Sequence, residues 1–344
     1  MKIAHIGIAS VIATVLSGAA FAAPLEYKKD AFSARVSGYG NVGVIEPNFA
    51  LPNAEFIGDW SARAQLTYDL TDGQRIGMVY SLNQKTTETG GAIDDLFALY
   101  QVKDYGRIEI GLTDSVSEKL GLGLPDVGGL RTNDDPIFYR EIKPDGAVIS
   151  DSTLDTGESA LRLNAVSAVK NGIQYGLSVA GITSKYDFTI DGGIKIRRPN
   201  GKTKTAYSFG MSFMNAPDNF SQSIYSPHVT ADWRAQTSFA VNVQYNSWVF
   251  ALTGRAIYDK NPVGVVSDGF IVGAGVSYDF LKYSVSLTYS LSDTGVWQSD
   301  VDDYLNHVVL SSFRYKYSEN VDGWISAGMT SETPFVSAGL RLTF

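Results

Sequence analysis

The last residues of the chain alternate between apolar and other side chains, and the alternation continues to the terminal Phe344. Successive side chains of a β-strand point to opposite faces, so this pattern predicts a strand with one apolar and one wet surface. The apolar face carries Val336, Ala338, Leu340, Leu342 and Phe344, and the wet face carries Ser337, Gly339, Arg341 and Thr343. Free chain ends normally fray, so a strand that runs to the last residue favours closure into a membrane β-barrel.

The same two-residue periodicity recurs along the chain and predicts fifteen strands. They cover 32–46, 60–70, 75–84, 95–103, 107–115, 160–169, 173–185, 205–214, 237–246, 248–259, 270–280, 283–292, 306–318, 324–331 and 333–344. Short connections rich in Asn, Asp and Gly alternate with long ones. The short connections are 71–74, 104–106, 170–172, 246–247, 281–282 and 319–323, and the long ones are 47–59, 85–94, 116–159, 186–204, 260–269 and 293–305.

This alternation gives each strand a direction, because outer-membrane barrels have short periplasmic turns and long outer loops. By this rule the strands 205–214 and 237–246 both run toward the periplasm. Consecutive strands of an antiparallel meander must alternate in direction, so these two cannot be consecutive. We therefore expect a further, upward strand within 220–233, where Pro227 weakens the pattern. With it the chain forms an all-β fold, a transmembrane antiparallel β-barrel of sixteen strands, whose even number permits closure and whose size leaves an aqueous lumen.

The start of the chain and its composition agree with an exported barrel. Residues 1–22 predict a signal peptide, with Lys2, an apolar stretch at 3–16 and a cleavage site at Ala20-Phe21-Ala22. Residues 23–344 then form one barrel domain. Cysteine is absent, so closure of the sheet and not disulfide bonds must hold the fold. A net charge of −8 argues against a nucleic-acid partner.

The connection 116–159 is the longest, and a loop of this length in a compact fold predicts a functional role. It contains the segment Leu-Pro-Asp-Val-Gly-Gly-Leu at 124–130, directly after the fifth predicted strand. In its leader, strand rhythm, long third loop and terminal Phe, the whole mature chain resembles the Gram-negative general diffusion porins. In that family the third loop carries a PEFGGD-type segment and folds into the lumen, so the resemblance implies the same path here.

The resemblance also implies a constriction at which acids of the loop face arginines of the wall. Asp126 matches the acid of the family motif, and Arg63 and Arg162 resemble the wall arginines of the second and sixth strands. The alternation independently places Arg35, Arg63 and Arg162 on the wet face.

Two positions depart from the family pattern. Leu130 stands where the motif has its final acid, and Asp94-Asp95 opens the fourth strand where the family usually has a basic residue. The predicted constriction residues are Asp126, Arg35, Arg63, Arg162 and Asp95. Simpler roles stay open, since inward arginines can merely solvate a wet wall and Asp126 can be an ordinary turn acid.

Other charged groups suggest further sites. The segment 186–204 reads as a basic exterior loop that can hold lipopolysaccharide phosphates, and its cations are Lys195, Arg197, Arg198, Lys202 and Lys204. Asp300, Asp302 and Asp303 lack the Gly and the bidentate Glu of a recognised calcium loop, so no metal is predicted.

Enzyme chemistry finds little support in the sequence. Neither His228 nor His307 accompanies a nucleophile motif such as G-x-S-x-G. A lipase-type site on the outer face, with Ser311 near His307, stays an alternative.

The sequence therefore predicts an outer-membrane channel for passive diffusion of small hydrophilic solutes and ions, without a cofactor and with weak cation preference. The resemblance implies a homotrimer among outer-membrane lipids and lipopolysaccharide. A substrate-specific channel and a surface-binding, adhesin-like barrel are the alternatives.

Overall fold

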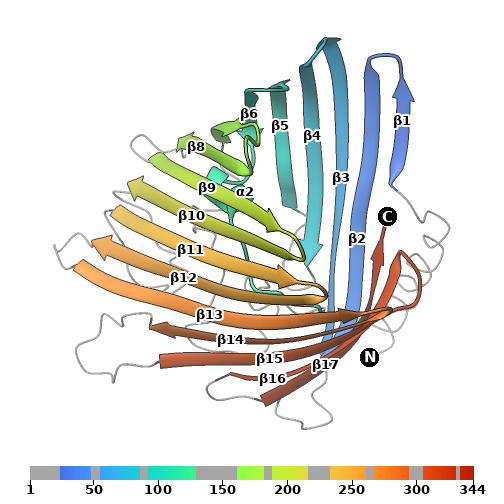
Figure 1. The fold of residues 1–344 in the computed structure, drawn as a ribbon, viewed down its shortest axis with the longest axis vertical. Helices are drawn as coiled ribbons and strands as arrows, with labels where there is room; N and C mark the ends of the chain where they lie inside the picture. Colours follow the sequence, from blue (N-terminus) through green and yellow to red (C-terminus); the bar gives the residue numbers. More distant parts are fainter. Residues whose placement is uncertain are drawn as a thin grey trace.

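Alternating apolar and polar residues form long antiparallel strands that join in one curved sheet (Figure 1). The computed structural model describes residues 24–47, 55–85, 92–128, 161–181, 188–215, 233–260, 266–293, 305–330 and 334–344. The signal peptide predicted at 1–22 lies outside these residues. No helix in the described ranges is long and apolar enough to cross a membrane.

The strands follow one another around the sheet in chain order. The first half comprises β1 (Leu25–Lys29), β2 (Phe32–Pro47), β3 (Glu55–Thr71), β4 (Gln74–Lys85), β5 (Ala92–Val102), β6 (Gly106–Leu112), β7 (Leu161–Ser167), β8 (Ile173–Gly181) and β9 (Phe188–Asn200). The second half comprises β10 (Thr203–Asn215), β11 (Trp233–Tyr245), β12 (Trp248–Lys260), β13 (Val266–Phe280), β14 (Tyr283–Asp293), β15 (Leu305–Lys316), β16 (Val321–Thr330) and β17 (Pro334–Thr343). A short helix, α2 (Val116–Leu120), follows β6.

Pairing of the last strand with β2 closes the sheet. β17 pairs with β2 from Phe335, opposite Pro47, to Thr343, opposite Tyr39. Strands β2 to β17 thus form a closed barrel of sixteen strands, which confirms the predicted strand number and fold class.

The terminal residue completes this seam. The Gly38 N–H donates to the Phe344 carbonyl at 2.8 Å, and the Phe344 N–H donates to the Gly38 carbonyl at 2.9 Å. A Cβ on Gly38 would lie 2.7 Å from the Phe344 ring, so only glycine leaves room for the terminal aromatic. In the N-terminal part of β2, β1 pairs with β2 in place of β17, from Leu25 opposite Val36 to Lys29 opposite Phe32.

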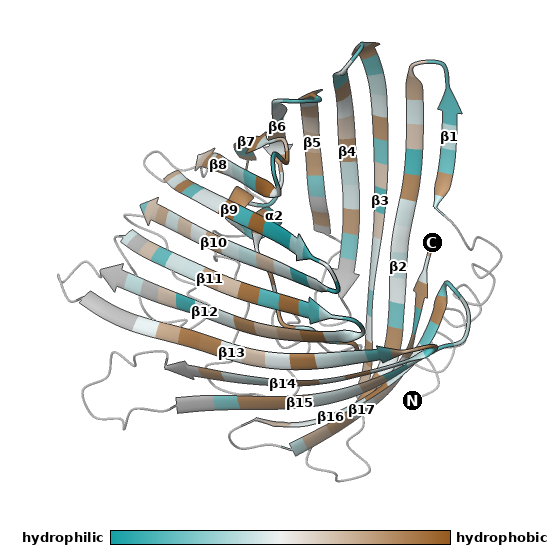
Figure 2. Ribbon diagram, in the orientation of Figure 1, coloured by the Kyte–Doolittle hydropathy of each residue, from teal (hydrophilic) through white to brown (hydrophobic). Residues whose placement is uncertain are grey.

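Hydrophilic and hydrophobic residues form bands along single strands (Figure 2), and the two faces of the sheet differ in polarity. Apolar side chains on the outer face are 47–64% exposed, for example those of Leu66, Met78, Leu177, Leu252 and Leu287. Inward side chains are largely polar and include Ser178, Asp191, Ser238, Thr288 and Ser326. Because directly opposed residues of an antiparallel sheet share a face, the register of the paired strands assigns their residues to one side or the other.

The sixteenth strand lies elsewhere than the sequence suggested. β10 pairs directly with β11 along its whole length, 203–215 against 233–245, so no strand separates them in the sheet. The segment 220–233, where we expected the additional strand, lies outside the described residues except for Trp233. The missing strand is β9, which pairs with β8 and with β10.

The interpretation of 186–204 as a basic exterior loop is therefore wrong. From Phe188 onward the segment is strand β9, followed by a tight turn at Gly201-Lys202 into β10. Gly192-Gly193 and Pro199 interrupt the apolar alternation, and the basic residues that suggested a solvated loop occupy several positions on the wet face of the strand. Only two residues separate β9 from β10, so this connection is one of the short turns. Residues 200–203 lie at the same end of the barrel as the predicted short turn at 170–172.

Candidate channel site

The third loop enters the barrel through α2. Ser115 caps the helix by accepting a hydrogen bond from the Glu118 N–H at 3.1 Å. Val116 and Leu120 lie one helical turn apart and pack with Val166 of β7 in a small buried cluster. Figure 1 shows α2 on the concave side of the sheet, next to β8 and β9.

Two glycines of the wall leave room for this helix. A Cβ on Gly176 of β8 would lie 2.9 Å from Val116 Cγ1, and one on Gly193 of β9 would lie 3.1 Å from Ser117 Cα. Gly176 and Gly193 are directly opposed in the sheet. Because neither glycine has a side chain, the backbone of α2 packs directly against the wall at these two positions.

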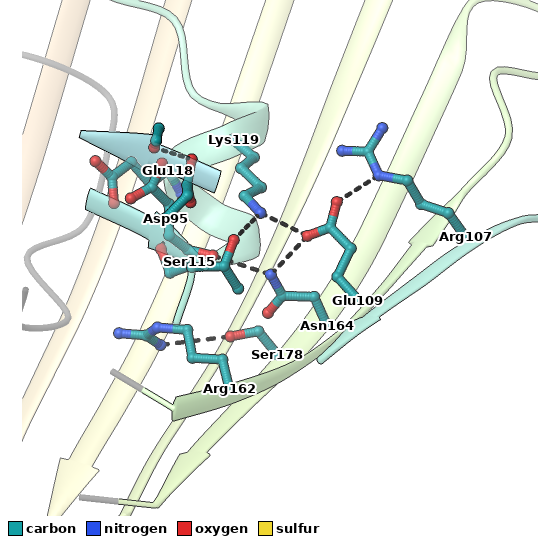
Figure 3. Close-up of polar contacts among 12 residues, drawn as sticks. Asp95, Arg107, Glu109, Ser115, Glu118, Lys119, Arg162, Asn164 and Ser178 are labelled. Carbon is teal, nitrogen blue, oxygen red and sulfur yellow. Dashed lines mark hydrogen bonds and ion pairs between the residues drawn. The ribbon is translucent and has the colours of Figure 1, made fainter. Parts of the chain in front are cut away.

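A buried ion pair fixes the first turn of α2 to the wall. Arg162 Nη1 of β7 donates to Asp191 Oδ2 of β9 at 3.3 Å, and neither side chain is exposed. The Ser178 hydroxyl donates to the same carboxylate oxygen. The Ser117 N–H of α2 donates to Asp191 Oδ1 at 2.9 Å. One carboxylate thus joins three donors, two from the sheet and one from the loop; the two from the sheet, Arg162 and Ser178, are labelled in Figure 3.

A second polar cluster fixes the last turn of α2. Lys119 Nζ donates to Glu109 Oε2 of β6 at 2.5 Å and lies 4.8 Å from the centre of the Phe97 ring. Glu109 also accepts from Asn164 Nδ2 at 3.0 Å and from Arg107 Nε at 2.6 Å (Figure 3). This carboxylate is buried and surrounded by donors.

Beyond α2, the loop follows the inner wall across the second half of the barrel. Lys195 Nζ of β9 donates to the Gly121 carbonyl at 3.1 Å, and Asn242 Nδ2 of β11 donates to the Gly123 carbonyl at 3.3 Å. The Val127 N–H donates to Ser286 Oγ of β14 at 3.2 Å.

The described part of the loop ends at β17. Arg341 Nη2 donates to the Gly128 carbonyl at 2.7 Å. A Cβ on Gly128 would lie 2.5 Å from both Ser312 Oγ and Ser326 Oγ, so the loop touches the wall closely here. Residues 116–128 therefore line the inner wall from β7 to β17.

The contacts of residues 116–128 described above lie on β5 to β17, and β2, β3 and β4 form the rest of the wall, which we call the open wall. Inward side chains there differ in exposure: Ser37, Tyr39, Arg63 and Gln65 are half-buried or exposed, but Asn41, Thr67, Val79 and Ser81 are buried. Most inward side chains from β7 to β16 are buried. Accessible polar side chains in this part of the wall thus lie on β2 and β3, and we call the space beside them the passage.

One ion pair crosses this open wall. Arg63 Nη1 donates to Asp95 Oδ2 at 2.8 Å, and the two side chains are 44% and 4% exposed. Ser81 Oγ donates to the same oxygen at 3.1 Å, and the Arg63 guanidinium lies 5.9 Å from the centre of the Phe97 ring. Arg63 therefore presents its charge to the passage while Asp95 anchors it from β5.

No protein-family model and no curated protein sequence matches the chain. Solved structures do resemble it. OmpT of Vibrio cholerae, solved in its trimer form, shares 11% identity, covers 92% of this chain and 100% of its own, and has a TM-score of 0.66. OmpF of Salmonella typhi, in complex with daunomycin, shares 11% identity, covers 93% and 100%, and has a TM-score of 0.65. The anion-selective porin of Comamonas acidovorans shares 13% identity, covers 91% and 100%, and has a TM-score of 0.61.

These likenesses extend over nearly the whole chain and agree with the closed sheet of sixteen strands. The chain has the porin fold. The resemblance drawn from the order of sequence elements is thereby shown at the level of fold.

Within the porin fold, the predicted site residues fall into different surroundings. Arg63 and Asp95 are paired on the open wall, as described above. Arg35 lies on the same wall, half exposed, and its Nε is 3.4 Å from Glu26 Oε1 of β1. Asp126 lies in the loop segment that follows the opposite wall, and its Oδ1 accepts from the Gly128 N–H at 2.9 Å, as in a turn.

Arg162 differs from the other predicted residues. It is enclosed beneath α2 and bonded to Asp191, so its charge serves to hold the loop and does not face the passage. Asp300, Asp302 and Asp303 lie outside the described residues, as does the part of the third loop at 129–160.

Sequence reasoning missed the residues that dock the loop: Asp191, Glu109, Lys119, Asn242 and Arg341. The sequence pattern places Asp191 in a loop, and nothing local distinguishes it from a solvated acid. Arg341 was placed on the wet face, but its partner lies 213 residues away in the chain. Periodicity alone does not report such partners.

Proposed function

We propose that the protein is an outer-membrane porin that lets small hydrophilic solutes and ions diffuse through a water-filled channel. The observation that carries this proposal is the asymmetric lumen, in which residues 116–128 of the loop lie against β7 to β17 and accessible polar side chains lie on β2 and β3. Rings of charged and polar side chains at a narrowing sort solutes by size and charge without a bound cofactor.

Export by the signal peptide at 1–22 and insertion among outer-membrane lipids accompany this proposal. The apolar outer face supports insertion into a bilayer. A homotrimer is proposed as well, supported by the trimer form of Vibrio cholerae OmpT, which shares the fold.

A lipase-type enzyme finds no support in the geometry. His307 and Ser311 both point outward from β15, but four residues along a strand separate them by about 13 Å. A base must reach its nucleophile within hydrogen-bond distance. The His307 ring nitrogen Nδ1 instead lies 2.7 Å from the Tyr289 hydroxyl. We therefore propose a channel and no enzyme.

Planar-bilayer recording tests the channel directly. The mature protein is expected to produce stepwise, ohmic conductance increments, and proteoliposomes containing it should swell in small sugars but not in large oligosaccharides. A protein that acts only as a surface-binding barrel would insert without conductance steps. That result would contradict the proposal.

We further propose weak cation preference at the constriction. Between 114 and 158 the chain carries ten acidic residues against Lys119, Arg131, Arg140 and Lys143. Most of these acids lie outside the described residues. An acidic surplus near a narrowing raises the local cation concentration, and salt screens the effect over about 8 Å at physiological ionic strength.

Single charge changes should shift this preference predictably. One charge about 8 Å from the ion path in water is worth about 0.5 kcal/mol, or about a twofold change in permeability ratio. Arg63→Ser is expected to raise the cation-to-anion ratio about twofold and Asp126→Asn to lower it, measured as reversal potentials in a potassium chloride gradient. Clear anion preference at low salt in all three proteins would show that the loop acids lie outside the ion path.

A further inference from the structure

The strands β7 to β10 carry many basic residues and few acidic ones. In the described segments 161–181 and 188–215, which form β7 to β10, Asp191 is the only acidic residue. The basic residues of these segments are Arg162, Lys170, Lys195, Arg197, Arg198, Lys202 and Lys204. Asp191 is already bound by Arg162, Ser178 and Ser117. Six cations thus remain near the end of the barrel with the short turns.

Three of these six point into the lumen. On β9, Asp191 and Gly193 face α2 inside the barrel, so Lys195 and Arg197 share that face by alternation. Ser208 lies directly opposite Lys195 and Ala206 opposite Arg197, so even-numbered residues of β10 face inward and Lys204 is among them. We call these three residues the lumen cation patch.

The three charges lie close together. Lys195 and Arg197 are two residues apart on one strand, and Lys204 is the diagonal neighbour of Arg197 across the β9 and β10 pair. Such diagonal neighbours have Cα atoms about 7–8 Å apart, within reach of long side chains.

The patch has no acidic partner among the described residues. The side chains of Arg197 and Lys204 are exposed and make no ion pair or hydrogen bond there, and Lys195 donates only to the Gly121 carbonyl. Their cross-strand neighbours on β8 and β11 are uncharged: Gln174 lies opposite Lys195, and Gln244 lies opposite Lys204.

We propose that the lumen cation patch is a binding site for small multivalent oxyanions, of which inorganic phosphate is the simplest. A tetrahedral oxyanion offers several acceptors at once, which suits an arginine fork flanked by two ammonium groups. The bond from Lys195 to the loop holds one of the three cations in place, so part of the site is ordered before the anion arrives. The inference rests on the proposed channel, because the anion reaches the patch through the lumen.

Because the patch lies near the mouth with the short turns, it also makes the channel asymmetric. The acids proposed for the constriction belong to the third loop, and the patch lies toward the end where β9 turns into β10. An anion that passes the constriction therefore meets a region of positive potential on that side.

The test compares phosphate binding by the full mature protein, refolded in detergent, with binding by variants. Broadening of the phosphorus-31 resonance of inorganic phosphate at constant ionic strength gives the apparent Kd. The triple variant Lys195→Gln, Arg197→Gln, Lys204→Gln should raise this Kd at least about tenfold, because charge-assisted contacts carry the affinity. Arg198→Gln is the matched control, because Arg198 is the next residue on β9 but points outward. The Kd of this variant for phosphate should stay within about twofold of the wild-type value.

Two results would overturn the site: wild-type protein that does not broaden the resonance, or an Arg198→Gln variant that loses as much affinity as the triple variant. If the triple variant does not refold, Lys204→Gln alone, near the start of β10, should still weaken binding about threefold. Bilayer recording of the same preparations separates this inference from the proposed function. If the protein conducts normally but does not bind phosphate, the proposed phosphate site is wrong and the proposed channel stands. If the protein does not conduct, the proposed channel is wrong, whether or not phosphate binds.

Discussion

Replacing Asp191 with alanine is expected to lower the free energy of unfolding by about 3–5 kcal/mol, because it leaves the Arg162 guanidinium buried without its charge partner. The substitution also removes the acceptor of the Ser117 N–H and of the Ser178 hydroxyl. Both side chains of the ion pair are fully enclosed, so water cannot replace the lost carboxylate. Equilibrium unfolding in urea, followed by tryptophan fluorescence of the protein in lipid vesicles, measures the change.

Asp69→Ala provides the matched control. Asp69 also pairs with an arginine of a neighbouring strand, since Arg75 Nε lies 2.6 Å from its Oδ1, but this pair is exposed. An exposed pair contributes only about 0–1 kcal/mol. The double variant Arg162→Met, Asp191→Leu should recover much of the loss, because it removes the buried charge together with its partner. Equal effects of Asp191→Ala and Asp69→Ala would contradict the anchoring role.

Deleting residues 124–130 is expected to widen the channel and to let larger sugars enter proteoliposomes several-fold faster. The deletion removes Val127 and Gly128, through which the loop contacts β14 to β17. A loop shortened by this segment no longer reaches along the wall to Arg341. The rate of liposome swelling in a series of oligosaccharides measures the size cutoff.

Ser326→Ala controls for a general disturbance of this wall. It removes a hydroxyl beside Gly128 and adds no volume, so the loop keeps its place and the cutoff should not change. An unchanged size cutoff after the deletion would show that residues 124–130 do not form part of the constriction.

Sequence periodicity predicted most of the barrel because each strand encodes its own two faces. The alternation at 336–344 assigned Arg341 to the wet face, and its bond to the loop carbonyl inside the barrel agrees. The tight turn at Asn171-Gly172 was predicted by residue type, and both residues adopt positive φ, 53° and 78°, as such turns require.

The same reasoning failed at β9. Phe188, Ile190, Ile194 and Ile196 alternate outward there, but Gly192-Gly193 interrupts the run. Gly193 leaves room for the helix that lies on it, whereas Gly192 lies on the outer face beside Leu177. Parity still required a sixteenth strand, so the number was correct although its position was wrong.

The sequence by itself thus determined the number of strands, the pairing of a strand that ends at Phe344 and the wet face of the strands other than β9, because these follow from local alternation, turn chemistry and parity. Only the tertiary structure decided which wet-face charges are free to act. Arg162 and Arg63 read alike in the sequence, yet one is enclosed by Asp191 beneath α2 and the other faces the open passage. The difference arises because the path of the third loop depends on contacts between residues up to 213 positions apart, and no local pattern records such contacts.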